Sequence, residues 1–281
     1  MLDSQDIVVG YDGSPEAAQA VRWAAKQAVL RDASLHLVHC HLRPVQAEGS
    51  EAVDAPGETG LDPSPEAILN TGLAQAKDIA PGLDVRGSLI YGWPAVHLAR
   101  IADGQQMLVV GSRGIGGFMG LLMGSVSLEM AATAGCPVAV VRTMDPRPGG
   151  AIVVAIDASG SADALADACQ MAVLTGAPLR ILHVQPEPHG WPLHRAQSDG
   201  EPADILSAAV ARARDLTGGG SVEGELLTDP STARAILDAA HDASLIVMGT
   251  KGRGLIRGTI GSTTHAVLHH ARGPVLVSRR K

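Results

Sequence analysis

Short runs of Val, Ile and Leu alternate along this chain with longer, alanine-rich stretches. Runs that are apolar on both faces are typical of parallel strands covered by helices. In the longer stretches the apolar positions recur every three to four residues, which is the period of an amphipathic helix. Alternating strands and helices indicate an α/β domain with a parallel sheet.

The pattern predicts the same series of elements twice. In the first half we expect strands near 6–10, 34–40, 83–90, 106–110 and 137–142, and helices near 15–31, 65–79, 94–103 and 124–134. In the second half we expect strands near 151–156, 178–184, 221–227, 244–248 and 274–278, and helices near 160–174, 202–217, 231–241 and 261–271. Ser14-Pro15 reads as an N-cap followed by proline in the first turn of a helix.

Four motifs of the first half recur in the same order in the second. Their offsets are 145 residues from Asp12 to Asp157, 144 from His39 to His183, 138 from Gly111 to Gly249 and 137 from Pro137 to Pro274. This agreement indicates a tandem duplication. We therefore predict one domain over 1–144 and another over 150–281. The linker would be 145–149, within a segment rich in Pro and Gly.

A glycine-rich segment follows the fourth strand of the first half, with six glycines between 111 and 124. Glycine allows backbone to approach a ligand closely, and a helix that starts at Gly124-Ser125 would offer free N–H groups to an anion. The segment therefore suits a phosphate chain. It contains no GxxxxGK[ST] motif, and its glycines do not fit GxGxxG.

The spacing that does fit is Gly-x2-Gly-x9-Gly-Ser, and it resembles the ATP-binding branch of the universal stress protein family. The four positions are Gly111, Gly114, Gly124 and Ser125. The resemblance extends over nearly the whole chain, once per half, and looks like the tandem stress proteins common in actinobacteria. It implies two tandem open five-stranded parallel sheets of order 3-2-1-4-5, with helices on both faces, in a Rossmann-like adenine-nucleotide-binding fold. In that order the first and fourth strands are neighbours where the winding reverses, which is where such sheets bind ligands.

The resemblance also implies which residues hold the nucleotide. Contacts to adenine and ribose fall on Gly10, Asp12, Cys40 and Val110, and contacts to phosphates fall on Gly111, Gly114, Gly124, Ser125 and Val126. Asp12 could bind the ribose or help to hold Mg²⁺ beside ATP, AMP or ADP. Arg113 could add charge at the rim or point to solvent.

The second half departs from the motif. Eight residues, one fewer than in the first half, separate Gly252 from Gly261-Ser262. The corresponding contacts would be Ala155, Asp157, Val184, Met248, Gly249, Gly252, Gly261 and Ser262. A shorter loop can displace a phosphate-binding amide, so whether this half binds nucleotide stays open.

Composition narrows the class of partner. The 281 residues carry a net charge of −7 and only 2% aromatic residues, which disfavours nucleic-acid binding. No apolar run reaches the roughly 20 residues of a membrane span, so no integral membrane contact is expected. The chain start lacks the features of a signal peptide, and the three cysteines form no CxxC motif. We therefore expect a cytoplasmic, reducing location.

Three functions stay open. The first is an ATP-binding regulatory stress protein with at most slow hydrolysis, an unknown protein partner and, as the resemblance implies, a homodimer formed through the last strands. The two halves could also pack as an internal pseudo-dimer, with two chains associating further. The second is an ATPase or nucleotidyl-transfer enzyme that uses Lys251, the only lysine in either glycine-rich loop. The third is an interaction module without nucleotide. His265 and His269 are expected on a solvated helix face rather than at a metal.

Overall fold

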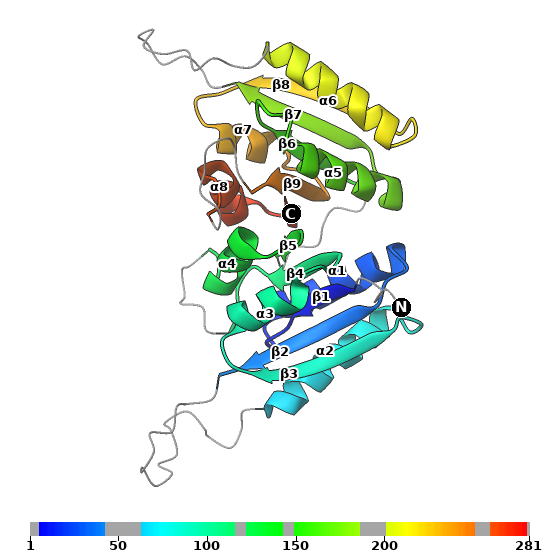
Figure 1. Cartoon of the computed structure of the whole chain (residues 1–281), viewed down its shortest axis with the longest axis vertical. Helices are drawn as coiled ribbons and strands as arrows, with labels where there is room; N and C mark the ends of the chain where they lie inside the picture. The colour runs from blue at the N-terminus through cyan, green and yellow to red at the C-terminus, as the bar shows by residue number, and fades with distance from the viewer. Residues whose placement is uncertain are drawn as a thin grey trace.

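The computed structural model describes residues 6–42, 63–115, 122–142, 149–185, 201–250 and 259–279 (Figure 1). The first half contains the strands β1 (Ile7–Gly10), β2 (Leu35–His41), β3 (Val85–Tyr91), β4 (Met107–Gly111) and β5 (Val138–Val141). Its helices are α1 (Pro15–Leu30), α2 (Pro65–Ile79), α3 (Pro94–Ala102) and α4 (Ser125–Thr133). These elements confirm the predicted alternation in the first half.

The second half repeats the series in the same order. Its strands are β6 (Ile152–Ile156), β7 (Leu179–Gln185), β8 (Val222–Thr228), β9 (Leu245–Gly249) and β10 (Val275–Ser278). Its helices are α5 (Ala162–Thr175), α6 (Pro202–Leu216), α7 (Thr232–Ala239) and α8 (Ser262–His270). None of the helices in the described ranges is long and apolar enough to cross a bilayer.

The two halves form one sheet of ten strands, in the order β3-β2-β1-β4-β5-β10-β9-β6-β7-β8. Each half has the expected 3-2-1-4-5 order with parallel strands. The two five-stranded sheets are not separate, however, because β5 and β10 pair antiparallel. In this pair Ala139 lies opposite Leu276, Val138 opposite Val277 and Val140 opposite Val275. Equivalent residues are exchanged across the pair, so the halves are related as an internal pseudo-dimer.

Four helices cover each face of the sheet. Alternate strand residues point to opposite faces, so each strand contributes to two cores. The first core holds residues of α1, α2, α5 and α6, and the second holds residues of α3, α4, α7 and α8. Both cores continue across the β5–β10 pair, which joins the halves by buried aliphatic side chains.

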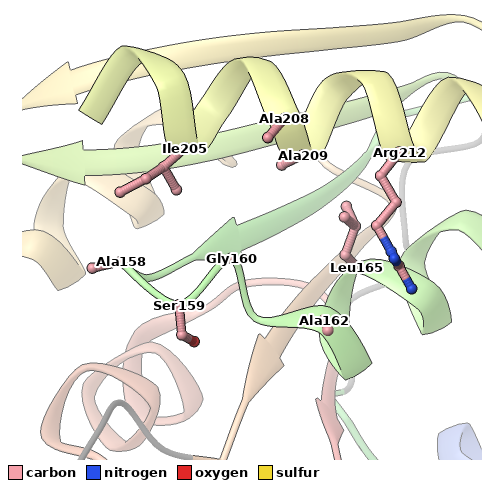
Figure 2. A pocket seen from close by; sticks show the side chains of 9 residues that line it. All are labelled: Ala158, Ser159, Gly160, Ala162, Leu165, Ile205, Ala208, Ala209 and Arg212. Atoms are coloured by element: carbon pink, nitrogen blue, oxygen red, sulfur yellow. The ribbon is translucent and has the colours of Figure 1, made fainter. Parts of the chain in front are cut away.

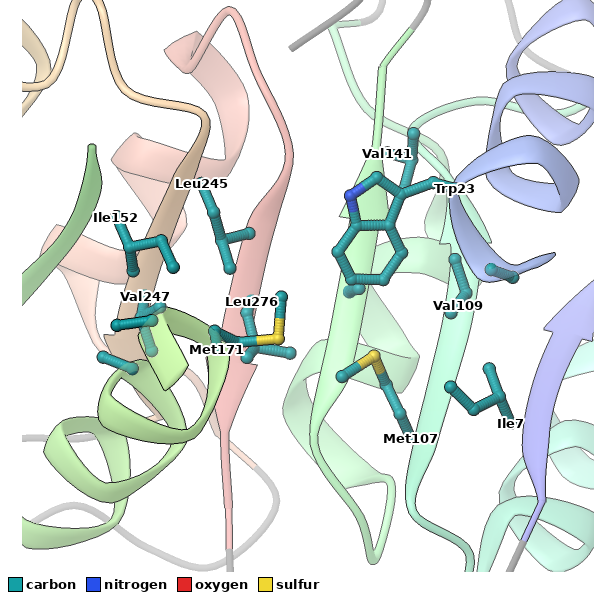
Figure 3. Close-up of a cluster of buried hydrophobic side chains, with 14 of the residues drawn as sticks. Ile7, Trp23, Met107, Val109, Val141, Ile152, Met171, Leu245, Val247 and Leu276 are labelled. Carbon is teal, nitrogen blue, oxygen red and sulfur yellow. The ribbon is translucent and has the colours of Figure 1, made fainter. Parts of the chain in front are cut away.

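Helices α1 and α5 flank this junction on the first face (Figure 3). Trp23 of α1 lies near Val141, and Met171 of α5 lies near Leu276. At the end of α1, Arg31 Nη2 lies 3.0 Å from Met171 Sδ. Burial lowers the pKa of Arg31, and the charge of Asp167 on α5 opposes that shift. The contact between the halves therefore includes the electrostatic attraction of Arg31 and Asp167 as well as apolar packing.

The starts of α1 and α5 differ. Ser14 caps α1 by accepting a hydrogen bond from the Ala17 N–H at 3.1 Å, and Pro15 begins the helix, as expected. Helix α5 begins at Ala162, after Gly160 and Ser161, which have φ of 77° and 44°. The second half therefore reaches its first helix through a longer, left-handed turn.

Candidate functional site

Asp12 and the glycine-rich turn meet at one edge of the sheet. Strands β1 and β4 are parallel neighbours, so their carboxyl ends open together. Asp12 follows β1, and its Oδ2 accepts a hydrogen bond from the Ile115 N–H at 2.9 Å, across 103 residues of sequence. Its Oδ1 accepts another from the Ser14 N–H at 2.9 Å. The carboxylate thus connects the start of α1 to the turn that follows β4.

The three motif glycines of the first half serve different purposes. A Cβ on Gly111 would lie 2.8 Å from the backbone carbon of Glu16, so β4 can pack against the start of α1 only with glycine there. A Cβ on Gly114 would overlap Asp12 Oδ2. At Gly124 a Cβ would lie 3.5 Å from Arg113 Cα, an ordinary contact. Gly124 is therefore the motif glycine whose own packing leaves room for a side chain.

Helix α4 begins beside this turn. The first N–H groups of any helix have no intrahelical acceptor, and the N-cap of α4, Gly124, supplies no side-chain acceptor for them. The Gly124 N–H donates to the Ser112 carbonyl at 2.8 Å, and Ser127 Oγ donates to the Gly111 carbonyl at 2.6 Å. These two bonds fix the helix start, while Ser125 is exposed and Val126 is half-buried. The arrangement favours an anion near Ser125 and Val126.

Arg113 follows neither of the two alternatives expected from the sequence. Its Nη2 and Nε lie 2.5 and 3.0 Å from Glu16 Oε1. Glu16 lies in the first turn of α1 and is buried. The arginine therefore neutralises a buried carboxylate instead of extending freely at the rim. Sequence reasoning missed Glu16 in this role, because nothing in the local pattern shows that the β4 loop covers it.

The expected adenine and ribose contacts lie on the second core face of the same half. Gly10, Val110 and Cys40 lie near α3, where a Cβ on Gly10 would be 3.3 Å from Leu98 Cδ1 and 3.5 Å from Val110 Cγ1. Burial raises the pKa of Cys40 to about 11, so its thiol is neutral. Leu98 is the residue here that the sequence did not single out; its helical period marked it only as core.

The second half reproduces part of this geometry. The Gly261 N–H donates to the Thr250 carbonyl and Thr264 Oγ1 donates to the Gly249 carbonyl, both at 2.8 Å. The start of α8 is therefore fixed in the same way as that of α4, although its loop is shorter. Ala155, Val184 and Met248 lie together in the second core, and Ser262 is exposed at the first position of α8. Gly252 and Lys251 lie outside the described residues.

Asp157 differs from Asp12 in its partners. It accepts hydrogen bonds from the Ser159 N–H at 2.9 Å, from Ser159 Oγ at 2.5 Å and from Ser161 Oγ at 3.1 Å. All three donors lie in the turn before α5. Asp157 therefore organises its own loop, and among the described residues no bond joins it to the turn after β9.

The two equivalent histidines each contact a backbone carbonyl at the end of a neighbouring strand. His39 Nδ1 lies 2.8 Å from the Tyr11 carbonyl, and His183 Nδ1 lies 3.1 Å from the Ile156 carbonyl. Each ring thus anchors the end of the neighbouring strand. Within the described ranges, no cluster of three or more His, Cys, Asp or Glu side chains could hold a metal.

His265 is exposed, as expected, and its ring lies beside that of His269, with the ring centroids 4.4 Å apart. His269 is half-buried: its Nε2 is shielded from solvent, and the charge of Arg142 from the first half acts on its ring. The reason is the β5–β10 pairing, which brings the first half against the end of α8.

Comparison with known proteins agrees with this architecture. The family model described as the universal stress protein family matches residues 4–142 and again 150–279. The universal stress proteins Rv2005c and Rv2623 of Mycobacterium tuberculosis are each 30% identical to the chain, and each match covers 98% of this chain and 97% of the relative. A universal stress protein structure from Archaeoglobus fulgidus covers all of both chains at 20% identity, with a TM-score of 0.67. The chain belongs to the universal stress protein family.

Proposed function

We propose that the first half binds an adenine nucleotide, ATP with Mg²⁺, at the edge where β1 and β4 end. The observation that carries this proposal is the contact of Asp12 with the turn at Gly114-Ile115, beside the uncapped start of α4. The carboxylate suits a ribose hydroxyl or the metal ion, and the amides at Ser125 and Val126 suit phosphates. The predicted contacts Gly10, Cys40 and Val110 would face the base and sugar.

We further propose that the nucleotide acts as a regulatory ligand and that hydrolysis is slow at most. Among the described residues at this edge, Asp12 accepts backbone N–H groups and Glu16 is paired with Arg113, so neither is placed as a free base. A protein that binds nucleotide without consuming it can shift between conformations and report the nucleotide level to a partner. ATP hydrolysis faster than about one turnover per minute, lost in Lys251→Ala, would favour the alternative of an enzyme.

The second half is the weaker candidate, because among the described residues Asp157 accepts hydrogen bonds only from its own loop and none from the turn after β9. The domain limits 1–144 and 150–281, the linker 145–149 and the cytoplasmic location stay proposals. Homodimerisation also stays one. The last strands β5 and β10 already pair within the chain, so two chains would have to associate through other surfaces.

Titration calorimetry with Mg-ATP tests the proposed site. Gly124→Val places a branched side chain at the start of α4, where an added Cβ makes only ordinary contacts but a phosphate would be displaced. We expect at least a tenfold loss of affinity. The matched control is Gly82→Val, because a Cβ at Gly82 meets nothing within 4 Å. Equal affinities for the wild type and Gly124→Val, with native circular dichroism, would refute the assignment of the loop.

A further inference from the structure

A pocket of about 320 Å³, open to solvent on one side, lies between α5 and α6 in the second half (Figure 2). Its lining consists of the turn before α5, the first turns of α5 and one face of α6: Ala158, Ser159, Gly160, Ala162, Leu165, Ile205, Ala208, Ala209 and Arg212. The pocket lies on the face of the first core, because its lining residues Leu165 and Ala209 belong to that core and Ile205 packs against it. The proposed nucleotide contacts of this half, such as Val184 and Met248, lie on the opposite face.

In the first half, the matching place is filled by the side chain of Tyr11. This residue is only 4% exposed. Its ring packs so closely on α2 that a Cβ on Gly72 would lie 2.8 Å from Tyr11 Cδ1. Burial raises the pKa of Tyr11, and a side-chain hydrogen bond with Gln75 partly opposes the rise. The first half therefore holds the Tyr11 ring between α1 and α2, with the tyrosine hydroxyl at Gln75.

The residue correspondence between the halves follows from their contacts. Helices α2 and α6 start at Pro65 and Pro202, and the glycine of the adjacent strand packs on Leu73 in one half and on Val210 in the other. The same offset of 137 residues relates both pairs. It places Ala209 at the position of Gly72 and Arg212 at that of Gln75.

The residue that corresponds to Tyr11 is identified from the contacts of the two equivalent histidines. His39 binds the Tyr11 carbonyl and His183 binds the Ile156 carbonyl, so Ile156 stands where the first half has Tyr11. At these equivalent positions the second half therefore has Ile156 in place of the aromatic residue, Ala209 in place of the glycine and Arg212 in place of the amide.

The chemistry of the pocket follows from these exchanges. Its floor is apolar, formed by the buried Leu165 and Ala209 and the half-buried Ile205. Arg212 reaches from α6 toward α5 at one end (Figure 2). Arg212 is exposed, its charge acts on the Cys169 thiol, and it makes no ion pair or hydrogen bond with any described residue. A guanidinium at the rim of an apolar wall suits a ligand that carries both a planar apolar group and an anionic oxygen pair.

We propose that this pocket binds a small aromatic carboxylate. The ring takes the place that the Tyr11 ring holds in the first half, and the carboxylate pairs with Arg212 where Gln75 meets the tyrosine hydroxyl. A cavity of about 150 Å³ already accepts benzene, so the available volume is sufficient. The pocket adjoins the proposed nucleotide contact Asp157 through Ser159, whereas its apolar wall lies on the opposite face from Val184 and Met248. The proposal does not depend on ATP binding.

The test uses 4-hydroxybenzoate as the probe and the full chain as the target, with affinity measured by NMR titration. We expect saturable binding, and at least tenfold weaker binding in Arg212→Gln, which restores the uncharged residue of the first half. Benzyl alcohol, which has the ring without the charge, should bind at least tenfold more weakly than 4-hydroxybenzoate to the wild type.

A second variant fills the pocket from within. Ile156→Tyr combined with Ala209→Gly transfers the ring and its glycine neighbour from the first half, and it should abolish binding while the thermal midpoint is kept or raised. A wild type that shows no saturable binding would overturn the proposal. So would unchanged affinity in Arg212→Gln, or unchanged affinity in a folded Ile156→Tyr/Ala209→Gly variant.

Discussion

Arg142 and Arg279 hold equivalent positions after the last strand of each half, and each binds the end of a helix in the other half. Arg142 Nη2 donates to the carbonyls of Leu268 and His269 in α8, at 2.5 and 2.8 Å. Arg279 donates to the carbonyl of Ala132, at the end of α4. The last carbonyls of a helix lack intrahelical donors and carry partial negative charge, so an arginine from outside both satisfies and neutralises them. The β5–β10 junction is therefore secured by two reciprocal C-terminal caps.

Removal of either cap should weaken the junction. We expect Arg142→Ala and Arg279→Ala each to lower the free energy of unfolding by about 1–2 kcal/mol, the range of a hydrogen bond to a charged group that is partly exposed. Urea unfolding followed by circular dichroism measures the change. The exposed Arg272, at the end of α8, is the matched control, and Arg272→Ala should stay within about 0.5 kcal/mol of the wild type. Equal effects at all three positions would contradict the role of the caps.

Substitutions should distinguish the motif glycine that packing requires, Gly111, from the one that faces the proposed ligand, Gly124. Gly111→Ala forces a Cβ against the backbone of α1 and should cost about 1–3 kcal/mol of stability. Gly124→Ala makes only an ordinary contact, so its cost should stay below about 1 kcal/mol. Thermal or urea unfolding of the two variants distinguishes them. A Gly124→Ala variant as unstable as Gly111→Ala would show that the whole motif serves packing.

Repetition made most of the fold predictable. Each apolar run was matched by another one half-chain away, so the element order and the strand order within each half followed from the sequence. The sequence did not decide whether β5 and β10 pair with each other or with strands of a second chain, because their apolar residues suit either partner. Arg142 and Arg279 gave no signal, since their partners are backbone carbonyls that any sequence provides.

The candidate site was predictable in part. The meeting of Asp12 with the turn after β4 followed from strand order, and Ile115 and Gly114 lie against that carboxylate. The pairing of Arg113 with Glu16 did not, because it depends on how the loop after β4 lies on α1. The pocket beside Arg212 could be recognised only by laying one half over the other in space.

Nucleotide stoichiometry should depend on Asp157 only if the second half binds. Its Oδ1 is held by Ser159 and Ser161 of its own loop, and among the described residues no bond joins the carboxylate to the turn after β9, so we expect one Mg-ATP per chain and no change of stoichiometry in Asp157→Ala. Asp12→Ala should instead remove the site of the first half. Calorimetric titration of the two variants provides the comparison. Two sites in the wild type, reduced to one by Asp157→Ala, would mean that both halves bind nucleotide.

The three cysteines should be poor nucleophiles in the native protein. Burial raises the pKa of Cys40 and Cys169 to about 11 and that of Cys136 to about 12. The thiolate is the reactive form, so at pH 8 about one thiol in a thousand, or fewer, is reactive at a given moment. We expect labelling by iodoacetamide to be slow in buffer and fast in 6 M urea, as followed by mass spectrometry. Rapid native labelling of any of the three would contradict the burial assigned to it.

Low pH should lower the free energy of unfolding through His269, which lies at the junction of the two halves. Burial lowers the pKa of His269, and the charges of His265, His270 and Arg142 lower it further. Below an ordinary histidine pKa of about 6.5 the unfolded chain therefore binds a proton that the folded chain resists, and stability falls as the pH decreases from there. His269→Gln should reduce this slope in urea unfolding between about pH 5 and pH 7. His241→Gln, at an exposed histidine, is the control, and equal slopes in the two variants would refute the prediction.

Hydrogen–deuterium exchange with and without Mg-ATP tests the proposed nucleotide site most directly, because it reports on backbone amides. The proposal predicts slower exchange at 111–115 and at 124–128, around Asp12's partner Ile115 and the start of α4, with no change at the turn around Gly82. Unaltered exchange in both segments at saturating Mg-ATP, or protection confined to other parts of the chain, would contradict it.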